Sequence, residues 1–311
     1  MQLTTPKKYP RLRRYSDLKP KSRDTIAGYL FISTYIIGLL VFTMYPFISS
    51  IYYSMTDYNT LEGGKFIGFD NFIKMFTADK RFWVSFKVTL TFAIIQIPVK
   101  LAFSLFIAMI LVKKTKLTNF YRAAFYVPSL VGGGVAMAIT WKQIWAKDGL
   151  INAFLEFFGI PGHNWLSDPN TALYVLILLG VWAFGSQMLI FLAALKDVPK
   201  DLYEAATLDG ATPAQQFFKI TLPMITPSLF FNLINGIIGA LQAFNSAFLI
   251  SNGGPLNSTL YFGLYQYRQG FQYRNMGYAS AMAWFLMVVI ALLTAITFRG
   301  SSTWVYYQSE D

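Results

Sequence analysis

Neutral polar side chains recur within one long apolar stretch of the sequence, about residues 224–250. The five side chains fall at three- to four-residue multiples, which places them near one face of a helix: Asn232, Asn235, Gln242, Asn245 and Ser246. Amides and hydroxyls donate and accept hydrogen bonds without carrying charge, which suits a hydroxyl-rich solute. The same groups also make hydrogen bonds between helices in a membrane bundle, and both interpretations stay open. Gln187, in the preceding apolar stretch, can join this polar strip.

The sequence lacks the residues that acid–base, thiol or metal chemistry would need. The chain contains no cysteine and a single histidine, His163, so neither a catalytic residue nor a metal ligand is predicted. No aspartate, glutamate or histidine falls within the long apolar stretches, although Lys87 and Lys100 lie in the second one. Ion-driven transporters need ionisable relays or ion sites inside the bilayer, so energy for uphill transport is expected from another protein. We expect Lys87 to extend toward the membrane surface and Lys100 to be structural.

Composition predicts the elements that position these side chains. Of 311 residues, 55% are apolar and 13% are charged, whereas soluble domains carry about 25% charged residues. Six stretches are long and apolar enough to cross a bilayer as helices: about residues 26–55, 86–112, 123–144, 173–195, 224–250 and 276–298. Several contain proline or glycine, which neighbouring helices in a bundle tolerate. The predicted fold class is an all-α integral membrane protein.

Lysine and arginine are distributed unequally between the two sides of this arrangement. The side that holds both termini carries sixteen of them, eight within the first 25 residues, and the opposite side carries eight. Because the more basic side faces the cytoplasm, both termini are predicted to be cytoplasmic. The net charge of +11 is better explained by orientation of the chain in the membrane and by contact with anionic lipid than by binding of nucleic acid. We expect a basic tail at 1–25, a transmembrane domain at 26–299 and a C-terminal tail at 300–311.

The cytoplasmic segment between the fourth and fifth stretches, residues 196–223, is predicted to form two short helices. Pro199 suits the first turn of one helix, and Gly210 suits the stop after it. Thr212 and Pro213 then suit the cap and first turn of the next helix. This hairpin is expected at the membrane surface, either as a packing element or as a docking element.

The same segment carries a family resemblance. Glu204-Ala205-Ala206, Asp209-Gly210-Ala211, Ile220, Leu222-Pro223 and Pro227 resemble the EAA loop of permeases in ATP-binding-cassette (ABC) importers. Residues 45–72, 244–259 and 275–299 are similar to carbohydrate importers of the maltose and glycerol-phosphate type, so the resemblance covers about residues 25–300. It implies a binding-protein-dependent permease subunit with the six-helix fold of type I importers.

The resemblance implies a transport subunit rather than an enzyme. In that family the loop docks into a cytoplasmic ATPase, so five residues are expected to couple the two proteins: Glu204, Ala205, Ala206, Asp209 and Gly210. The chain lacks a Walker sequence, so no cofactor is expected here, and ATP and Mg²⁺ belong to the partner ATPase. The implied partners are a second homologous permease, two ATPase subunits and an extracytoplasmic solute-binding protein, in a bacterial cytoplasmic membrane.

The implied solute is a carbohydrate, most simply an oligosaccharide. Its path is predicted along Gln187, Asn235, Gln242, Asn245 and Ser246. A uronate is an open alternative, because Lys87 and Lys100 could meet a negative charge. The turn at Gly253, Gly254 and Pro255 is expected either to dock the binding protein or to be a simple tight turn.

Two other classes of protein are weighed against the importer. An ion-coupled secondary transporter predicts intramembrane carboxylates, which the sequence lacks. A membrane enzyme acting on lipid or glycan predicts a cluster of acidic residues, histidine or serine near one interface. The first external loop contains Asp57, Glu62, Asp70 and Asp79, but their spacing fits neither acid–base nor metal chemistry.

Overall fold

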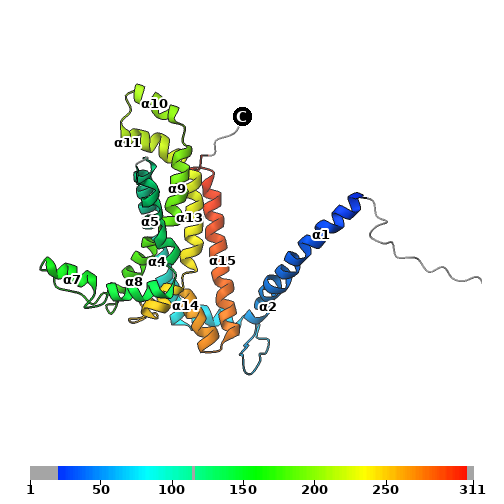
Figure 1. Cartoon of the computed structure of the whole chain (residues 1–311). Helices are drawn as coiled ribbons and strands as arrows, with labels where there is room; N and C mark the ends of the chain where they lie inside the picture. Colours follow the sequence, from blue (N-terminus) through cyan, green and yellow to red (C-terminus); the bar gives the residue numbers. More distant parts are fainter. Residues whose placement is uncertain (1–19, 114–115, 307–311) are drawn as a thin grey trace, which may run out of the picture. The chain divides into compact units, whose positions relative to one another are not determined.

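The computed structural model describes residues 20–113 and 116–306 of the chain. Most of the predicted basic tail, residues 1–19, lies outside the described residues. The regular secondary structure of the described residues is helical, and the loops between the helices contain isolated β-bridges (Figure 1). The chain divides into two compact units, residues 1–52 and 53–311, each of which is described by itself.

The first unit contains one long helical segment. It comprises α1 (Pro20–Leu39), the π-helical turn η2 (Leu40–Met44) and α2 (Tyr45–Ser54), whose last residues belong to the second unit. The π-helical turn lies directly before Pro46, which cannot donate the regular helical hydrogen bond to a carbonyl four residues earlier. Residues 27–54 have a mean hydropathy of 1.8 and are a candidate membrane span, close to the predicted stretch.

The second unit is a bundle organised around one long helix. Its longer helices are α4 (Lys80–Val112), α5 (Thr118–Val131), α6 (Val135–Ile144), α8 (Ala172–Trp182), α9 (Gly185–Asp197), α13 (Thr226–Leu241) and α15 (Met276–Ser301). Its shorter helices are α3 (Asp70–Thr77), α7 (Leu150–Phe157), α10 (Lys200–Leu208), α11 (Pro213–Gln216), α12 (Leu222–Met224) and α14 (Phe262–Tyr267). Three π-helical turns complete it: η3 (Phe217–Thr221), η4 (Ala247–Ser251) and η5 (Arg268–Gln272). The central helix is α4, which packs against α5, α8, α9, α13 and α14.

Length and composition give between three and six candidate spans. Residues 27–54, 80–112 and 276–301 each form one long apolar helix. Three more spans are counted only if a bent pair of helices forms one span: α5 and α6 meet at 101°, α8 and α9 at 44°, and the α11–α12 segment and α13 at 64°. The last pair begins at Pro213, within the predicted loop of residues 196–223, rather than at residue 224. The predicted stretch at 123–144 therefore consists of two helices that meet at a sharp bend. Three consecutive glycines, at residues 132–134, separate α5 from α6 and provide the flexible backbone for that turn.

The predicted helix at 224–250 also ends early. The helix α13 stops at Leu241, and residues 242–244 leave the helical path before the chain turns helical again. Phe244 stabilises this departure because its ring packs against Phe248 at 5.1 Å and Tyr267 at 5.4 Å between ring centroids. A single polar face running from Asn232 to Ser246 is therefore wrong, because the break separates its two halves.

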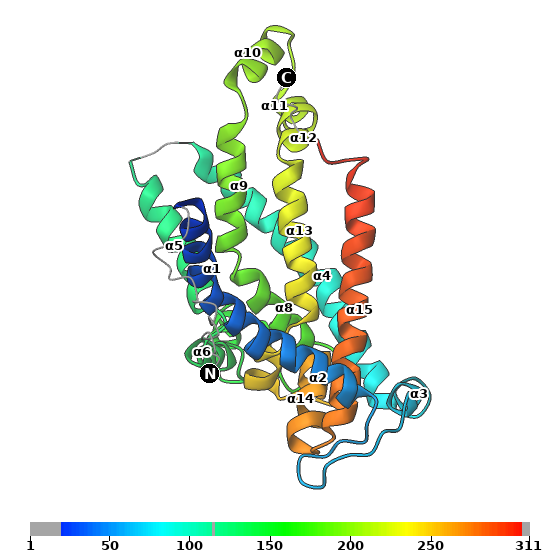
Figure 2. The same cartoon turned by 90° about the vertical axis from the view of Figure 1, so that its right-hand side faces the viewer.

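The two ends of the second unit carry different structures. Beyond one end of α9 and α13 lies the hairpin of α10 and α11, whereas α3 and α14 lie toward the other end (Figure 2). The chain after α15 returns to the hairpin end, where the backbone N–H of Tyr306 donates to Thr226 Oγ1 at 2.9 Å. The helices thus run between two distinct ends, and the hairpin of residues 198–225 is called the finger below.

A carboxylate ties three helices together at the end opposite the finger. Asp79 caps α4 by accepting hydrogen bonds from the backbone N–H groups of Arg81 and Phe82. Its other oxygen, Oδ2, accepts the hydroxyl of Tyr265 from α14 at 2.7 Å and that of Tyr278 from α15 at 2.6 Å. Asp79, considered above with the first external loop, therefore has a structural role.

Candidate functional site

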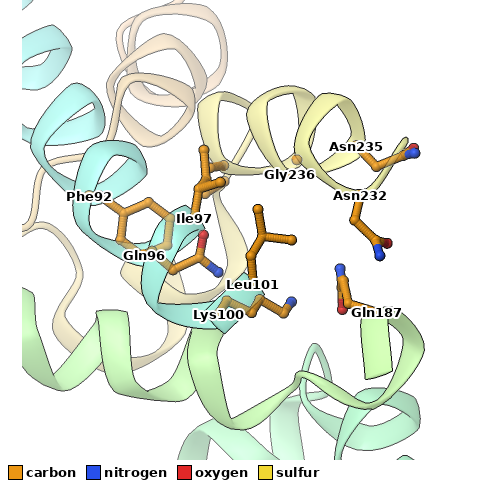
Figure 3. A pocket seen from close by; sticks show the side chains of 12 residues that line it. Phe92, Gln96, Ile97, Lys100, Leu101, Gln187, Asn232, Asn235 and Gly236 are labelled. Carbon is orange, nitrogen blue, oxygen red and sulfur yellow. The ribbon is translucent and has the colours of Figure 1, made fainter. Parts of the chain in front are cut away.

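A cavity of about 270 Å³ lies among α4, α9 and α13. Its polar lining comes from three helices: Gln96 and Lys100 from α4, Gln187 from α9, and Asn232 and Asn235 from α13 (Figure 3). Small residues of α13, Gly236 and Gly239, form part of its wall. The sequence places these amides far apart, and the packing of α9 and α13 on α4 brings them together.

A second cavity of about 430 Å³ adjoins the first. It holds the remaining predicted path residues, Gln242, Asn245 and Ser246, which lie at the break after α13. Gly132 and Gly133, from the turn between α5 and α6, form another part of its wall. Phe92, Lys100 and Ala243 line both cavities, so the two spaces share a boundary.

Lys100 lies at the boundary of the two cavities. It follows Pro98 by two residues in α4 and lines both spaces, and its expected structural role stays a prediction. Among the described residues, it is the only charged side chain in either lining. A lysine within an apolar helix was the available signal, because charges inside membrane segments usually serve a function.

The amide side chains that line the first cavity differ in whether their polar atoms have hydrogen-bond partners. Asn232 is 1% exposed, and its Nδ2 donor has no hydrogen-bond partner in the described structure. The Oε1 acceptor of Gln187 is likewise buried without a partner in the described part of the chain. Asn235 instead donates to the backbone carbonyl of Phe231 at 2.8 Å and points away from the other amides (Figure 3). Two residues of the lining, Asn232 and Gln187, thus each keep one buried polar atom without a hydrogen-bond partner in the described structure.

Gln96 is buried against α8 as well as facing the first cavity. A Cβ atom at Gly180 would lie 2.7 Å from Gln96 Nε2, so a larger residue there would require the end of the Gln96 side chain to move. The sequence offered no signal for this pair, since the two residues lie 84 positions apart.

The finger has the two-helix form predicted from its sequence. Pro199 caps the first helix, α10, and Gly210 follows it with a φ of +77°, a conformation that glycine adopts without strain. Thr212 and Gln215 form a capping box, in which the Gln215 N–H donates to Thr212 Oγ1 at 3.3 Å and the Thr212 N–H donates to Gln215 Oε1 at 2.8 Å. Tyr203 Oη and Thr221 Oγ1, 2.8 Å apart, join the two arms.

The predicted coupling residues lie on two sides of the finger. Glu204 and Ala205 are exposed, whereas Ala206, Asp209 and Gly210 line a hollow of about 370 Å³ between the arms. Leu208, which the sequence analysis did not single out, is 90% exposed beside them. The one ion pair in the described structure joins other residues, so Glu204 is unpaired there. The finger therefore presents an unpaired carboxylate and an uncovered leucine together.

The turn at Gly253, Gly254 and Pro255 belongs to a closely bonded loop. Arg268 Nη2 donates to the carbonyl of Asn252 at 2.7 Å, and Thr259 Oγ1 donates to that of Gly254, also at 2.7 Å. Gly253 is buried, with a φ of +77°, and the peptide bond before Pro255 is cis. Leu256 in this loop is 87% exposed. Any docking here therefore involves Leu256 more directly than Gly253.

The single histidine has a structural environment. His163 Nε2 and Asp168 Oδ2 lie 3.0 Å apart, and the His163 backbone bonds both amide atoms of Asn152. The Asn170 N–H donates to Asp168 and lowers the pKa of that carboxyl, with His163 acting in the same direction. The described residues hold no group of three or more histidine or acidic side chains that could bind a metal ion.

Long apolar helices, a polar cavity between them and an exposed hairpin define an integral membrane protein with a solute path. The family model for binding-protein-dependent transport system inner membrane components matches residues 75–301. The chain belongs to this family. It is accordingly a multi-pass permease subunit of the bacterial inner membrane, not a catalytic chain, and the alternatives of secondary transporter and membrane enzyme are excluded.

Individual relatives agree with this assignment. The chain is 50% identical over 303 residues to the probable ABC transporter permease protein YesP of Bacillus subtilis (strain 168), covering 95% of this chain and 98% of that protein. It is 33% identical over 287 residues to the arabinooligosaccharides transport system permease protein AraP of the same organism, covering 89% of each. A chain of the crystal structure of a bacterial alginate ABC transporter matches with a TM-score of 0.77 at 23% identity, covering 90% of this chain and 95% of that one. This structural likeness supports the fold.

Proposed function

We propose that this chain forms half of the translocation pathway of an ATP-driven saccharide importer. A second homologous permease completes the pathway, two cytoplasmic ATPase subunits bind ATP and Mg²⁺, and an extracytoplasmic binding protein delivers the solute. The chain has six spans of the type I permease fold, with both termini in the cytoplasm. The finger docks into an ATPase subunit through Glu204, Ala205, Ala206, Asp209 and Gly210, and the exposed Leu208 extends that contact.

The observation that carries the proposal is the direct connection between the finger and the cavity walls. Only Val198 and Pro199 separate α10 from α9, the helix that carries Gln187. Only Ile225 separates α12 from α13, the helix that carries Asn232. Val198 and Ile225 are both buried in one apolar cluster, so the connections are packed rather than free. A displacement of the finger is therefore transmitted to both cavity walls. Coupling between two distant sites requires an element that both share, and here α9 and α13 are that element.

The proposed orientation of the chain is supported by its basic residues and by the finger. The finger, the link between α4 and α5, and the residues after α15 lie at one end of the second unit. Lys116, Arg122, Lys196, Lys200 and Arg299 lie near that end along the helices. A cytoplasmic position for this end agrees with the positive-inside rule and places the finger where ATP is available. The loop of residues 251–259 then faces the binding protein, with Leu256 at its surface.

A saccharide suits the chemistry of the two cavities. Amide and hydroxyl groups supply the neutral donors and acceptors that sugar hydroxyls need, and Phe92 adds an aromatic surface at their boundary. Gln187, Asn235, Gln242, Asn245 and Ser246 all lie on this proposed path, although Asn235 faces its edge. Relatives named for arabinooligosaccharides and for lactose, the latter 31% identical, support the same solute class.

The proposal is tested with the complex itself. The tagged chain is co-purified with its partner subunits, reconstituted in proteoliposomes with the binding protein, and supplied with radiolabelled saccharides. We expect ATP-dependent uptake in wild type and at least a tenfold loss of both uptake and bound ATPase in Glu204→Lys, because the substitution reverses the charge at the docking surface. Wild-type uptake in Glu204→Lys would contradict the coupling role.

The matched control is Glu62→Lys. Glu62 is also exposed, but it lies outside the finger, in the segment before α3. This variant makes the same change of charge and is expected to keep the ATPase subunits and to retain wild-type uptake. Recovery of the wild-type chain alone, stable and without a second permease or an ATPase, would contradict the proposed architecture.

A further inference from the structure

We propose that the two joined cavities select a saccharide carrying an ionised carboxylate, which Lys100 binds. The inference rests on the proposed import function and adds to it the charge of the solute and the residue that recognises it. It is carried by the position of one lysine on the boundary of both cavities, beside amides whose polar atoms lack partners.

The position of Lys100 exposes its charge to both spaces. The cavities of about 270 and 430 Å³ share Lys100 in their linings, so a solute passing from one to the other meets this side chain. Figure 3 shows the Lys100 amine directed into the first cavity, toward the side on which Gln187 lies. Lys87, by contrast, is exposed and lines neither cavity in the described structure.

The surroundings of Lys100 supply no negative charge. In the described structure no aspartate or glutamate lines either cavity, and the packed helices α8 and α13 contain none. Asp197 on α9 lies ten residues beyond Gln187, about 15 Å along the helix axis. A cation in an apolar helix bundle is costly unless an anion or polar groups compensate it. A carboxylate on the solute provides that compensation.

The unpartnered amide atoms match the remaining groups of such a solute. Asn232 Nδ2 is a buried donor without a partner, and it can bind a carboxylate oxygen or a ring hydroxyl. Gln187 Oε1 is a buried acceptor without a partner, and it can accept a sugar hydroxyl. Both atoms belong to side chains that line the first cavity with Lys100, and each is itself buried, so a solute reaches them once the amides turn toward it. A monoanionic sugar acid meets the charge of Lys100, whereas a neutral sugar leaves the lysine without a counterion.

The test compares acidic and neutral saccharides that differ only at the charged group. Proteoliposomes containing the whole complex and its binding protein receive uronate disaccharides, each paired with its carboxyl-reduced neutral counterpart. The readout is uptake per ATP hydrolysed, which separates solute recognition from coupling. In wild type we expect the acidic member of at least one pair to be taken up at least tenfold more per ATP, a difference of about 1.4 kcal/mol.

Three variants assign the selectivity to Lys100. Lys100→Gln is expected to lose at least tenfold of acidic uptake per ATP while keeping binding-protein-stimulated ATPase, and Lys100→Arg, which keeps the charge, is expected to retain most uptake. Lys87→Gln is the matched control on the same helix and is expected to behave as wild type.

The outcomes separate this inference from the proposed function. Preference for the neutral members in wild type, or unchanged acidic uptake per ATP in Lys100→Gln, would overturn the carboxylate inference and leave saccharide import intact. Absence of ATP-dependent uptake for both members of every pair would overturn import itself. If Lys100→Gln does not assemble, the wild-type ratio and Lys100→Arg still decide the matter.

Discussion

The two ends of the second unit are held together in opposite ways. At the end opposite the finger, polar side chains join separate elements: Asp79 binds two tyrosines, and Thr89 Oγ1 accepts the backbone N–H of Phe262 at 2.8 Å. In the finger, most side-chain hydrogen bonds stay within the hairpin, as between Gln216 Nε2 and Thr207 Oγ1 at 3.0 Å. One end is cross-linked into the bundle, and the other is bonded within itself.

This difference indicates which part of the molecule moves as a body. A hairpin that satisfies its own backbone can shift without breaking hydrogen bonds to the bundle, whereas the opposite end cannot shift without losing several. In the proposed coupling, the buried links at Val198 and Ile225 carry displacement of the finger into α9 and α13. The cross-linked end is then the proposed fixed reference against which those helices move. Three predictions test the contrast, ordered from the largest expected effect.

The largest effect is expected from Gly277→Ala, at the fixed end. A Cβ atom at this position would lie 2.0 Å from the carbonyl oxygen of Thr56, and the Gly277 N–H donates to the Tyr58 carbonyl at 3.0 Å. The backbone of residues 56–58 would have to move, and we expect a destabilisation of about 3 kcal/mol. Thermal unfolding of the purified complex measures it.

Gly300→Ala is the control for that substitution. Gly300 lies in the same helix, α15, and a Cβ atom there meets nothing within 4 Å. This variant is expected to unfold at the wild-type temperature or slightly above it, since alanine favours helix. Equal unfolding temperatures for both variants would show that the start of α15 is not packed as described.

A smaller effect is expected from Asp79→Ala. The substitution removes the cap of α4 and leaves the hydroxyls of Tyr265 and Tyr278 without their acceptor, so we expect a loss of about 2 kcal/mol in stability. Asp70→Ala, at an exposed aspartate in the first turn of α3, is the control and should stay within about 0.5 kcal/mol of wild type. If the two alanine variants lose equal stability, Asp79 does not join the three helices.

The smallest effect on stability is expected at two exposed leucines, one at each end. Leu208→Asp in the finger should leave unfolding unchanged and reduce bound ATPase at least tenfold, about 1.4 kcal/mol, because it places a charge at the docking surface. Leu256→Asp in the opposite loop should keep the ATPase and weaken binding-protein-stimulated activity instead. Co-purification measures the bound ATPase, and ATPase assays measure the stimulation by the binding protein. Identical effects of the two variants would refute the proposal that the finger binds the ATPase and the opposite loop contacts the binding protein.

Much of the fold followed from local sequence. Apolar length predicted α4 and α15, and Gly210, Thr212 and Pro213 predicted the turn and second helix start of the finger, because caps and left-handed turns depend on a few adjacent residues. The bends were harder. Gly132 marks one bend, but no proline or glycine lies in residues 242–244, where packing of Phe244 interrupts the helix.

The candidate site was predictable only in part. Composition identified the amides, and the structure brings all five predicted path residues to two adjoining cavities. Helical periodicity did not predict how these path residues come together, because Gln242 and Ser246 lie beyond the break after α13. The importance of Lys100 and the burial of Gln96 depend on contacts between helices distant in sequence, which no local pattern contains.

The turn between α5 and α6 has a consequence for the size of the solute. Gly132 and Gly133 contribute backbone alone to the wall of the larger cavity. At Gly132 an added Cβ would lie 3.0 Å from that of Ala183, whereas at Gly133 it would meet nothing within 4 Å. A methyl group at residue 133 can therefore narrow the cavity without disturbing the packing around it. On the proposed solute path, a substitution at residue 133 therefore tests the length of saccharide admitted separately from the stability of the protein.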